Sequence, residues 1–205
     1  MSVRTVATVA GEPVRVDEVD AAEARLRCGP AAAALPASGT GEGRQLRRWL
    51  TQLIVTERVI AAEAAARGLT ASGAPAEAEL LPDATARLEI GSVAAAALAD
   101  PRARALFADV TAAVRVGDHD VADYHARNPL RFAAPRPGPD GWRAPSLAGP
   151  PLAEVRSAIA DHLGGAARRR AFRVWLDARR DALVRLAPGY EHPGDPRQPD
   201  NTHRH

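Results

Sequence analysis

Apolar residues at helical spacing between Leu46 and Ala64 constrain the fold of this chain more than any other feature. They recur three, four and seven positions apart, with Glu57 as the one polar exception, and so predict a long amphipathic helix near 43–67. Gly68 follows directly, and glycine is a common residue just beyond a helix end. Because one face of such a helix is apolar, other elements of the chain must pack against it.

The composition favours a helical partner for that face. Apolar residues make up 46% of the chain, many of them alanine, whereas aromatic residues make up only 4%. An alanine-rich chain with few aromatic residues favours close-packed helices over a β-sandwich. The length of 205 residues suits one domain, or one domain with appendages. We therefore expect a mainly α fold.

Local patterns predict the remaining elements. A turn at Gly11 joins two predicted strands, Asp17 is the predicted N-cap of the helix that follows them, and Pro101 begins a further helix. The predicted elements are strands at 5–10 and 13–16, helices at 18–28, 84–99, 101–114 and 118–127, a loop at 133–151, and helices at 152–163 and 166–186 separated by a break or kink at Gly164-Gly165.

Three segments carry a pattern in a particular order. They are the hairpin sequence at 6–19, the helix sequence at 50–69, and a run with Tyr124, Asn128, Pro129 and Phe132. In this order they resemble the SurA/PrsA-type chaperones, whose hairpin and helical module precede a parvulin prolyl isomerase domain. In that family a C-terminal helix folds back on the N-terminal module, and residues 152–186 are similar to it.

The resemblance implies a scaffold without its enzyme. Only the Pro/Gly-rich residues 133–151 stand where the parvulin domain would be, and they are too few to form one. We therefore expect a SurA-N-like module at 1–132, a linker at 133–151, C-terminal helices at 152–187 that pack on the module, and a Pro/His-rich tail at 188–205. No parvulin-type prolyl isomerase activity is expected.

The leading functional hypothesis is a non-catalytic chaperone-like or assembly factor that binds a client protein. Similar short actinobacterial proteins associated with aromatic polyketide genes suggest a biosynthetic enzyme as the client. The alternative is an enzyme or small-molecule binder of secondary metabolism that uses the same helical cleft. The sequence lacks the Gly-x-Ser-x-Gly nucleophile elbow that an acyltransferase of the α/β-hydrolase type would need.

Large side chains on the predicted helices are the candidates for lining a client or ligand cleft. They are Trp49, Leu53, Phe172 and Trp175, although their positions on helix stripes also suit a core. Trp142 differs because it lies in the Pro/Gly-rich linker. There it would serve either as a contact anchor for a partner or as a plug in the scaffold's own cleft.

The tail concentrates histidines. His203 and His205 are two positions apart, so in an extended chain both rings lie on one face and could bind a divalent metal together with His192. Two other interpretations stay open: a proline-stiffened docking arm, and plain disorder. Apart from this site, no cofactor is expected.

Charge and cysteine content bound the partners and the compartment. All 27 basic residues are arginine and the net charge is only +2, so no nucleic-acid surface is predicted. A single cysteine, Cys28, and the absence of an export signal or a long apolar stretch predict a cytoplasmic protein that binds no membrane. Packing of the C-terminal helices across two chains, in a homodimer, is compatible with the same sequence.

Overall fold

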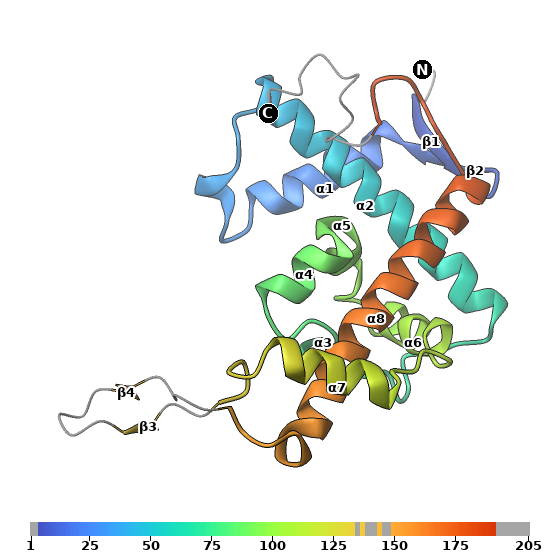
Figure 1. Cartoon of the computed structure of the whole chain (residues 1–205). Coiled ribbons are helices and arrows are strands. Elements are labelled where there is room, and N and C mark those ends of the chain that lie inside the picture. The colour runs from blue at the N-terminus through green and yellow to red at the C-terminus, as the bar shows by residue number, and fades with distance from the viewer. Residues whose placement is uncertain (1–3, 134–135, 138–142, 145–148, 192–205) are drawn as a thin grey trace.

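Helices dominate the structure, a computed structural model that describes residues 4–133, 136–137, 143–144 and 149–191 (Figure 1). A small antiparallel sheet lies at the N-terminal end, so the predicted mainly α class with an N-terminal hairpin is confirmed. Among the described helices, none combines the length and the apolar composition that crossing a membrane requires.

The sheet joins the two ends of the described chain. Strands β1 (Thr5–Val9) and β2 (Glu12–Arg15) form a hairpin whose two turn residues, Ala10 and Gly11, have φ angles of 51° and 87°. Such a two-residue turn with positive φ matches the twist of the strands that it connects. The other edge of β1 pairs with β5 (Val184–Leu186), which gives the strand order β2-β1-β5.

Helices α1 (Val16–Arg27) and α2 (Gly41–Ala66) follow the hairpin, and a short 3-10 helix, η1 (Ala32–Ala34), lies between them. The predicted N-cap of α1 is wrong. Arg15 occupies that position, and its backbone N–H donates to the Glu18 carboxylate at 2.9 Å. The prediction of α2 is confirmed.

Four shorter helices follow α2, and the last two of them pack on it: α3 (Glu77–Leu80), α4 (Ala84–Ile90), α5 (Ser92–Ala97) and α6 (Pro101–Val110). The single helix predicted at 84–99 is wrong, because Gly91 adopts a φ of 89° and divides it. Asp100 caps α6 by accepting from the backbone N–H of Arg102 at 2.8 Å, directly before the proline that was predicted to begin the helix.

Helix α7 (Asp118–Arg127) precedes a short ladder between β3 (Arg136–Pro137) and β4 (Arg143–Ala144), within the segment predicted as a loop. The ladder extends to one side of the helical body (Figure 1).

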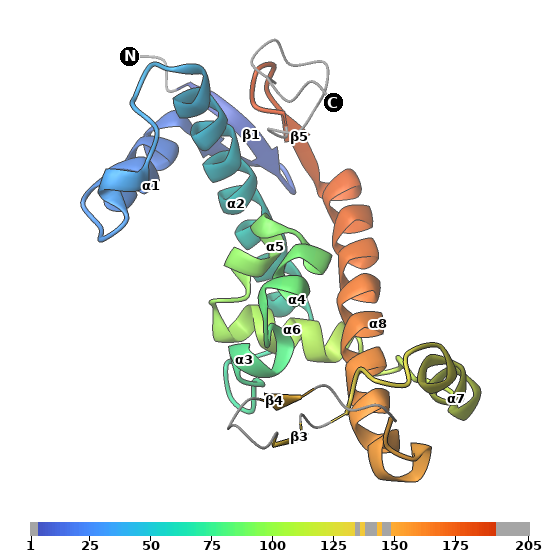
Figure 2. The ribbon, with the colours of Figure 1, turned by 60° about the vertical axis from the view of Figure 1, so that its left-hand side comes forward.

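Helix α8 (Leu152–Leu183) runs without interruption from α7 to the sheet (Figure 2). Of the break or kink predicted at Gly164-Gly165, the break is therefore wrong, as is the extension of the helix to residue 186. Each glycine costs about 1 kcal/mol relative to alanine inside a helix. Packing on both sides offsets this cost, since α7 contacts α8 while α2, α4 and α6 also contact it.

Two groups of buried side chains pack against α8. The main core joins α8 to α2 and α6 and includes Val55, Val59, Leu106, Phe107, Phe172 and Leu176. The satellite cluster joins the N-terminal part of α8 to α7, and its buried members are Val121, Val155 and Ile159. Helix α8 thus contributes side chains to both the main core and the satellite cluster.

Candidate functional site

The aromatic residues predicted on α8 are part of the packing of the main core. Phe172 is fully buried, and its ring centroid lies 5.0 Å from that of Phe107 on α6. Trp175 is partly buried and stacks near Phe172, with the Arg67 guanidinium 5.3 Å from its ring centroid. These contacts stabilise the packing of α8 on α6 and α2, and neither residue lines the groove described below.

The other predicted cleft residues differ in their placement. Leu53 is partly buried against the main core. Trp49 is also partly buried, but its indole N–H donates to Ser92 Oγ at 3.1 Å, and Ser92 lines a cavity beside α8. Trp142 lies outside the described residues. Of the four described members of this set, the structure therefore brings Trp49 alone to the edge of an open site.

That site is a groove along α8, where the helix faces α4 and α5. Two cavities of about 560 Å³ and 490 Å³ share Arg173 and Asp177, and together we call them the α8 groove. Volumes of this size suit a side-chain cluster or a small ligand. The walls are formed by Leu88, Glu89, Ile90, Gly91, Ser92, Val93 and Ala94 on one side, and by Ala166, Arg170, Arg173, Val174, Leu176, Asp177, Arg180 and Asp181 on the other.

Exposed apolar side chains mark the groove. Leu88 is 80% exposed and Val174 is 65% exposed, and both line it. Leu130, which is 51% exposed, lies elsewhere. Val174 is not among the residues predicted from the sequence to line a cleft. The sequence does contain a signal for it, since this apolar residue lies off the stripe formed by Phe172, Trp175 and Leu176. Such a residue indicates a contact surface where it lies on the same concave surface as other exposed apolar side chains, as Val174 and Leu88 do.

A half-buried cation forms part of the groove wall. The Arg180 guanidinium donates to Thr56 Oγ1 at 2.8 Å and to the Gln52 side-chain oxygen. Gln52 in turn donates to the carbonyl of Tyr190 at 2.9 Å. Burial lowers the pKa of Arg180, against the opposing effect of Asp177 and Asp181. The side chain still carries its charge at neutral pH, so it is a partly dehydrated cation.

Glu63 holds the opposite face of α8 to α2. Its side chain is 9% exposed and accepts hydrogen bonds from Arg67 and from Arg179, whose Nε lies 2.7 Å from Oε1. Burial by itself raises the pKa of this carboxyl, but the two arginines outweigh it and hold the pKa below its ordinary value. The arrangement is a buried anion with its charge satisfied, which is a structural rather than a reactive state.

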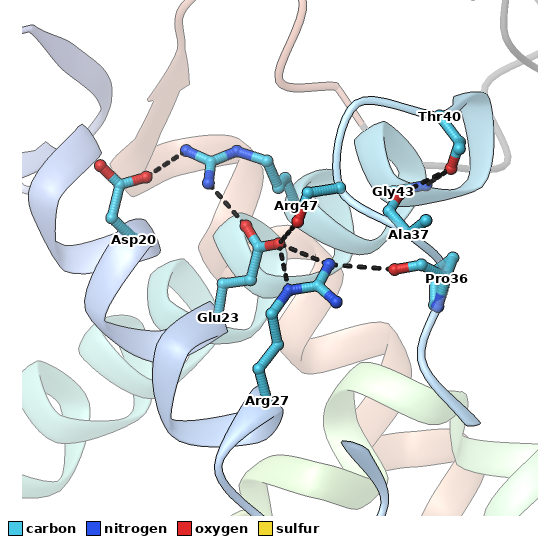
Figure 3. A network of polar contacts seen from close by, with 9 residues as sticks. Asp20, Glu23, Arg27, Pro36, Ala37, Thr40, Gly43 and Arg47 are labelled. Atoms are coloured by element: carbon cyan, nitrogen blue, oxygen red, sulfur yellow. Dashed lines mark hydrogen bonds and ion pairs between the residues drawn. The ribbon is translucent and has the colours of Figure 1, made fainter. Parts of the chain in front are cut away.

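A second polar network connects α1, α2 and the loop between them (Figure 3). Glu23 is buried and accepts from Arg27 Nε at 2.9 Å and from Arg47 Nη1 at 2.7 Å. Arg27 also donates to the carbonyl of Pro36 at 3.0 Å, which fixes the loop. Burial raises the pKa of Glu23, but the hydrogen bonds from the two arginines leave it lowered overall.

The cavity beside this network has a volume of about 460 Å³ and includes Ser38, whose hydroxyl lies 3.4 Å from Glu23 Oε1. The Glu23 carboxylate is already engaged by Arg27 and Arg47, so it is poorly placed to act as a base. The network therefore connects three segments of the fold and has little capacity for chemistry.

The predicted metal ligands, His192, His203 and His205, lie outside the described residues. Within residues 4–133, 136–137, 143–144 and 149–191, no group of three or more histidine, cysteine, aspartate or glutamate side chains is arranged to bind a metal ion.

The class of protein is thus a mainly α scaffold with a small three-stranded sheet and a groove along its longest helix. A family of unknown function, DUF7158, matches residues 5–42. Those residues form β1, β2, α1, η1 and the first residues of α2, and they include Glu23, Arg27 and Pro36 of the network in Figure 3. No curated protein and no solved structure significantly matches the chain.

Proposed function

We propose that this chain is a non-catalytic chaperone-like or assembly factor, on a scaffold of the SurA/PrsA type, and that it binds a segment of a client protein in the α8 groove. The observation that carries the proposal is the placement of Leu88 and Val174 on that groove, both largely exposed. Exposed apolar residues that gather around a concave surface are characteristic of protein-binding sites.

Three further features support a binding role. The groove is open along α8, so an extended segment could lie in it without entering an enclosed pocket. Its wall mixes apolar and charged side chains, which suits a polypeptide better than a purely apolar ligand. The buried carboxylates Glu23 and Glu63 are both neutralised by arginines, and this arrangement favours a rigid scaffold over acid–base chemistry.

We also propose that the protein acts in the cytoplasm. Cys28 is free and exposed, a state that a reducing compartment preserves. We propose further that the client is an enzyme of aromatic polyketide biosynthesis, as the resemblance suggests.

The test uses a permanently unfolded client, reduced and carboxymethylated α-lactalbumin carrying a fluorophore. Fluorescence anisotropy would measure its affinity for the wild-type protein and for the double variant Leu88→Ser/Val174→Ser. Removing two apolar anchors should weaken binding by about tenfold or more. The matched control is Leu130→Ser, which removes the exposed leucine outside the groove and should leave the affinity unchanged.

Three outcomes would contradict the proposal. They are no saturable binding by the wild-type protein, equal binding by the double variant, and an equal loss in Leu130→Ser. Sedimentation of each variant completes the design. If the wild-type protein is a dimer that the groove substitutions dissociate, the groove is an interface between two copies and not a client site.

A further inference from the structure

The arginines of α8 that are at least partly buried differ in their partners. Arg169 and Arg179 pair with carboxylates, at 2.7 Å from Glu89 and 2.7 Å from Glu63 respectively. The Arg180 side chain is also partly removed from water, yet among the described residues it donates only to the neutral side chains of Thr56 and Gln52. Partly buried cations usually have an anionic partner, because hydrogen bonds to neutral groups replace only part of the lost hydration. Arg180 is therefore the α8 cation with the most to gain from a carboxylate.

The cavity beside Arg180 has room for a carboxylate from a client. Arg180 lines this cavity of about 560 Å³ together with the apolar side chains of Ile90, Val93 and Leu176. The lining also includes polar side chains, among them Arg173 and Asp177, so an ion pair formed here is strengthened on its apolar side, where the local dielectric constant is lower. Asp177 and Asp181 lie on the same helix and line the same cavity, but within the described residues neither has a carboxylate oxygen within 4.0 Å of a guanidinium nitrogen of Arg180. Both are exposed, so water screens their charges.

Further cations extend along the groove from this point. Arg173 lines both cavities and Arg170 lines the second, and both side chains are exposed. Among the described residues, neither has a carboxylate within ion-pair distance. Because residues three and four apart share a helix face, Arg170, Arg173 and the neighbouring Val174 present charge and apolar surface side by side.

We infer that Arg180 binds a side-chain carboxylate of the client, and that the α8 groove selects acidic segments in which apolar residues alternate with aspartate or glutamate. The apolar residues of such a segment would contact Leu88 and Val174, while its carboxylates would reach Arg180 and Arg173. This inference rests on the proposed function, since it names the chemistry of the client that the same groove would bind. The fork of an arginine side chain suits a carboxylate, which it can engage with two parallel hydrogen bonds.

The experiment compares three fluorophore-labelled peptides with blocked termini, in which leucine alternates with glutamate, with glutamine or with arginine. Fluorescence anisotropy at low and moderate salt would give their affinities for the full chain. The glutamate peptide should bind at least about tenfold more tightly than the glutamine peptide, because charge-assisted hydrogen bonds are the stronger ones. Its advantage should shrink as salt is added, and the arginine peptide should bind most weakly.

Variants then assign the preference to particular residues. Arg180→Gln should remove most of the advantage of the glutamate peptide, and Arg180→Lys should restore only part of it, since lysine keeps the charge without the fork. Because Arg180 also bonds to α2, a loss in Arg180→Gln alone could reflect altered packing. Arg173→Gln, at an exposed position without such bonds, should reduce the affinity for the glutamate peptide by about two- to fivefold. Arg102→Gln, an exposed arginine on α6 outside the groove, is the matched control and should change nothing.

The possible failures are distinguishable. If the glutamate and glutamine peptides bind equally and both lose affinity in Leu88→Ser/Val174→Ser, the groove binds clients but the carboxylate preference is wrong. If the preference is real but survives both Arg180→Gln and Arg173→Gln, the assignment to these residues is wrong. If no peptide and no unfolded client binds, the proposed function itself is contradicted.

Discussion

The main core and the satellite cluster are built on the same helix, yet they differ in how they are held. In the main core, α8 contacts α2, α4 and α6 and carries the fully buried Phe172. Arginines extend from the same part of α8 to carboxylates on other helices, as Arg179 does to Glu63. The satellite cluster packs against α7 and the residues that flank it, including Val116 and Phe132, and has three buried side chains. Its polar contacts include a hydrogen bond of 3.1 Å between Tyr124 and His162 and an exposed ion pair between Arg156 and Asp118.

This difference shows that a continuous helix need not be uniformly stable. Segments with few buried apolar contacts open locally at a lower free energy than the global unfolding transition. We therefore expect α7 and the N-terminal part of α8 to exchange amide hydrogens before the main core does. The α8 groove lies beside the more stable half, which suits a binding surface that must keep its shape.

The largest effect is expected from Phe172→Ala. This change removes a fully buried ring that contacts Phe107 and Trp175, and it should reduce the free energy of unfolding by about 4 kcal/mol. Chemical denaturation followed by circular dichroism would measure it. Val174→Ala, two positions away on the exposed side, should cost less than about 0.5 kcal/mol. Similar losses in both variants would show that the main core does not carry the stability assigned to it.

An intermediate effect is expected from Glu63→Gln, which leaves Arg67 and Arg179 without their shared carboxylate. The variant should lose about 2 kcal/mol at neutral pH, since both arginines keep partial access to water. A carboxyl whose pKa is lowered in the folded state stabilises the protein above its ordinary pKa of 4.5, and this stability is lost as the pH falls below that value.

Denaturation series at neutral and acidic pH would therefore show a smaller pH dependence for Glu63→Gln than for the wild-type protein. Glu12→Gln provides the control, because this glutamate is exposed on β2. An unchanged pH dependence in Glu63→Gln would contradict the role assigned to the buried anion.

The smallest global effect is expected from Ile159→Ala in the satellite cluster. Although Ile159 is fully buried, its loss should change the free energy of the main-core unfolding transition by less than about 1 kcal/mol, because the satellite opens before that transition and does not contribute to it. Hydrogen exchange should nevertheless accelerate by about tenfold or more at the amides of α7, where the packing is lost. A full global loss, equal to that of Phe172→Ala, would mean that the two cores unfold as one cooperative unit.

Sequence patterns predicted the helices whose signals are local. The apolar stripe of α2, the Asp100-Pro101 start of α6 and the α7 segment each follow from spacing or capping. The errors arose where tertiary contacts decide. Gly164 stays helical because packing on α7 and the main core supports the helix on both sides, and Val184 leaves the helix because the free edge of β1 offers hydrogen bonds.

The groove was harder to predict than the fold. Helical stripes identify side chains that face a core, and for this reason they selected Phe172 and Trp175, which are packed inside. Which residues stay exposed around a concave surface depends on how α4 and α5 are placed against α8. That placement follows from the positive φ of Gly91, which divides the predicted helix. Without the position of this turn, the sequence could not show that Leu88 and Arg180 line the same cavity.

The pairing of β1 with β5 also has a consequence for synthesis of the chain. Ala7 leaves the ribosome well before Leu186, its partner in the sheet. Until that partner emerges, one edge of β1 has no strand beside it, and an open edge is a template for pairing with other chains. Such a contact has a very large sequence separation, which slows folding. The sheet is therefore the last part of this fold that a nascent chain can complete.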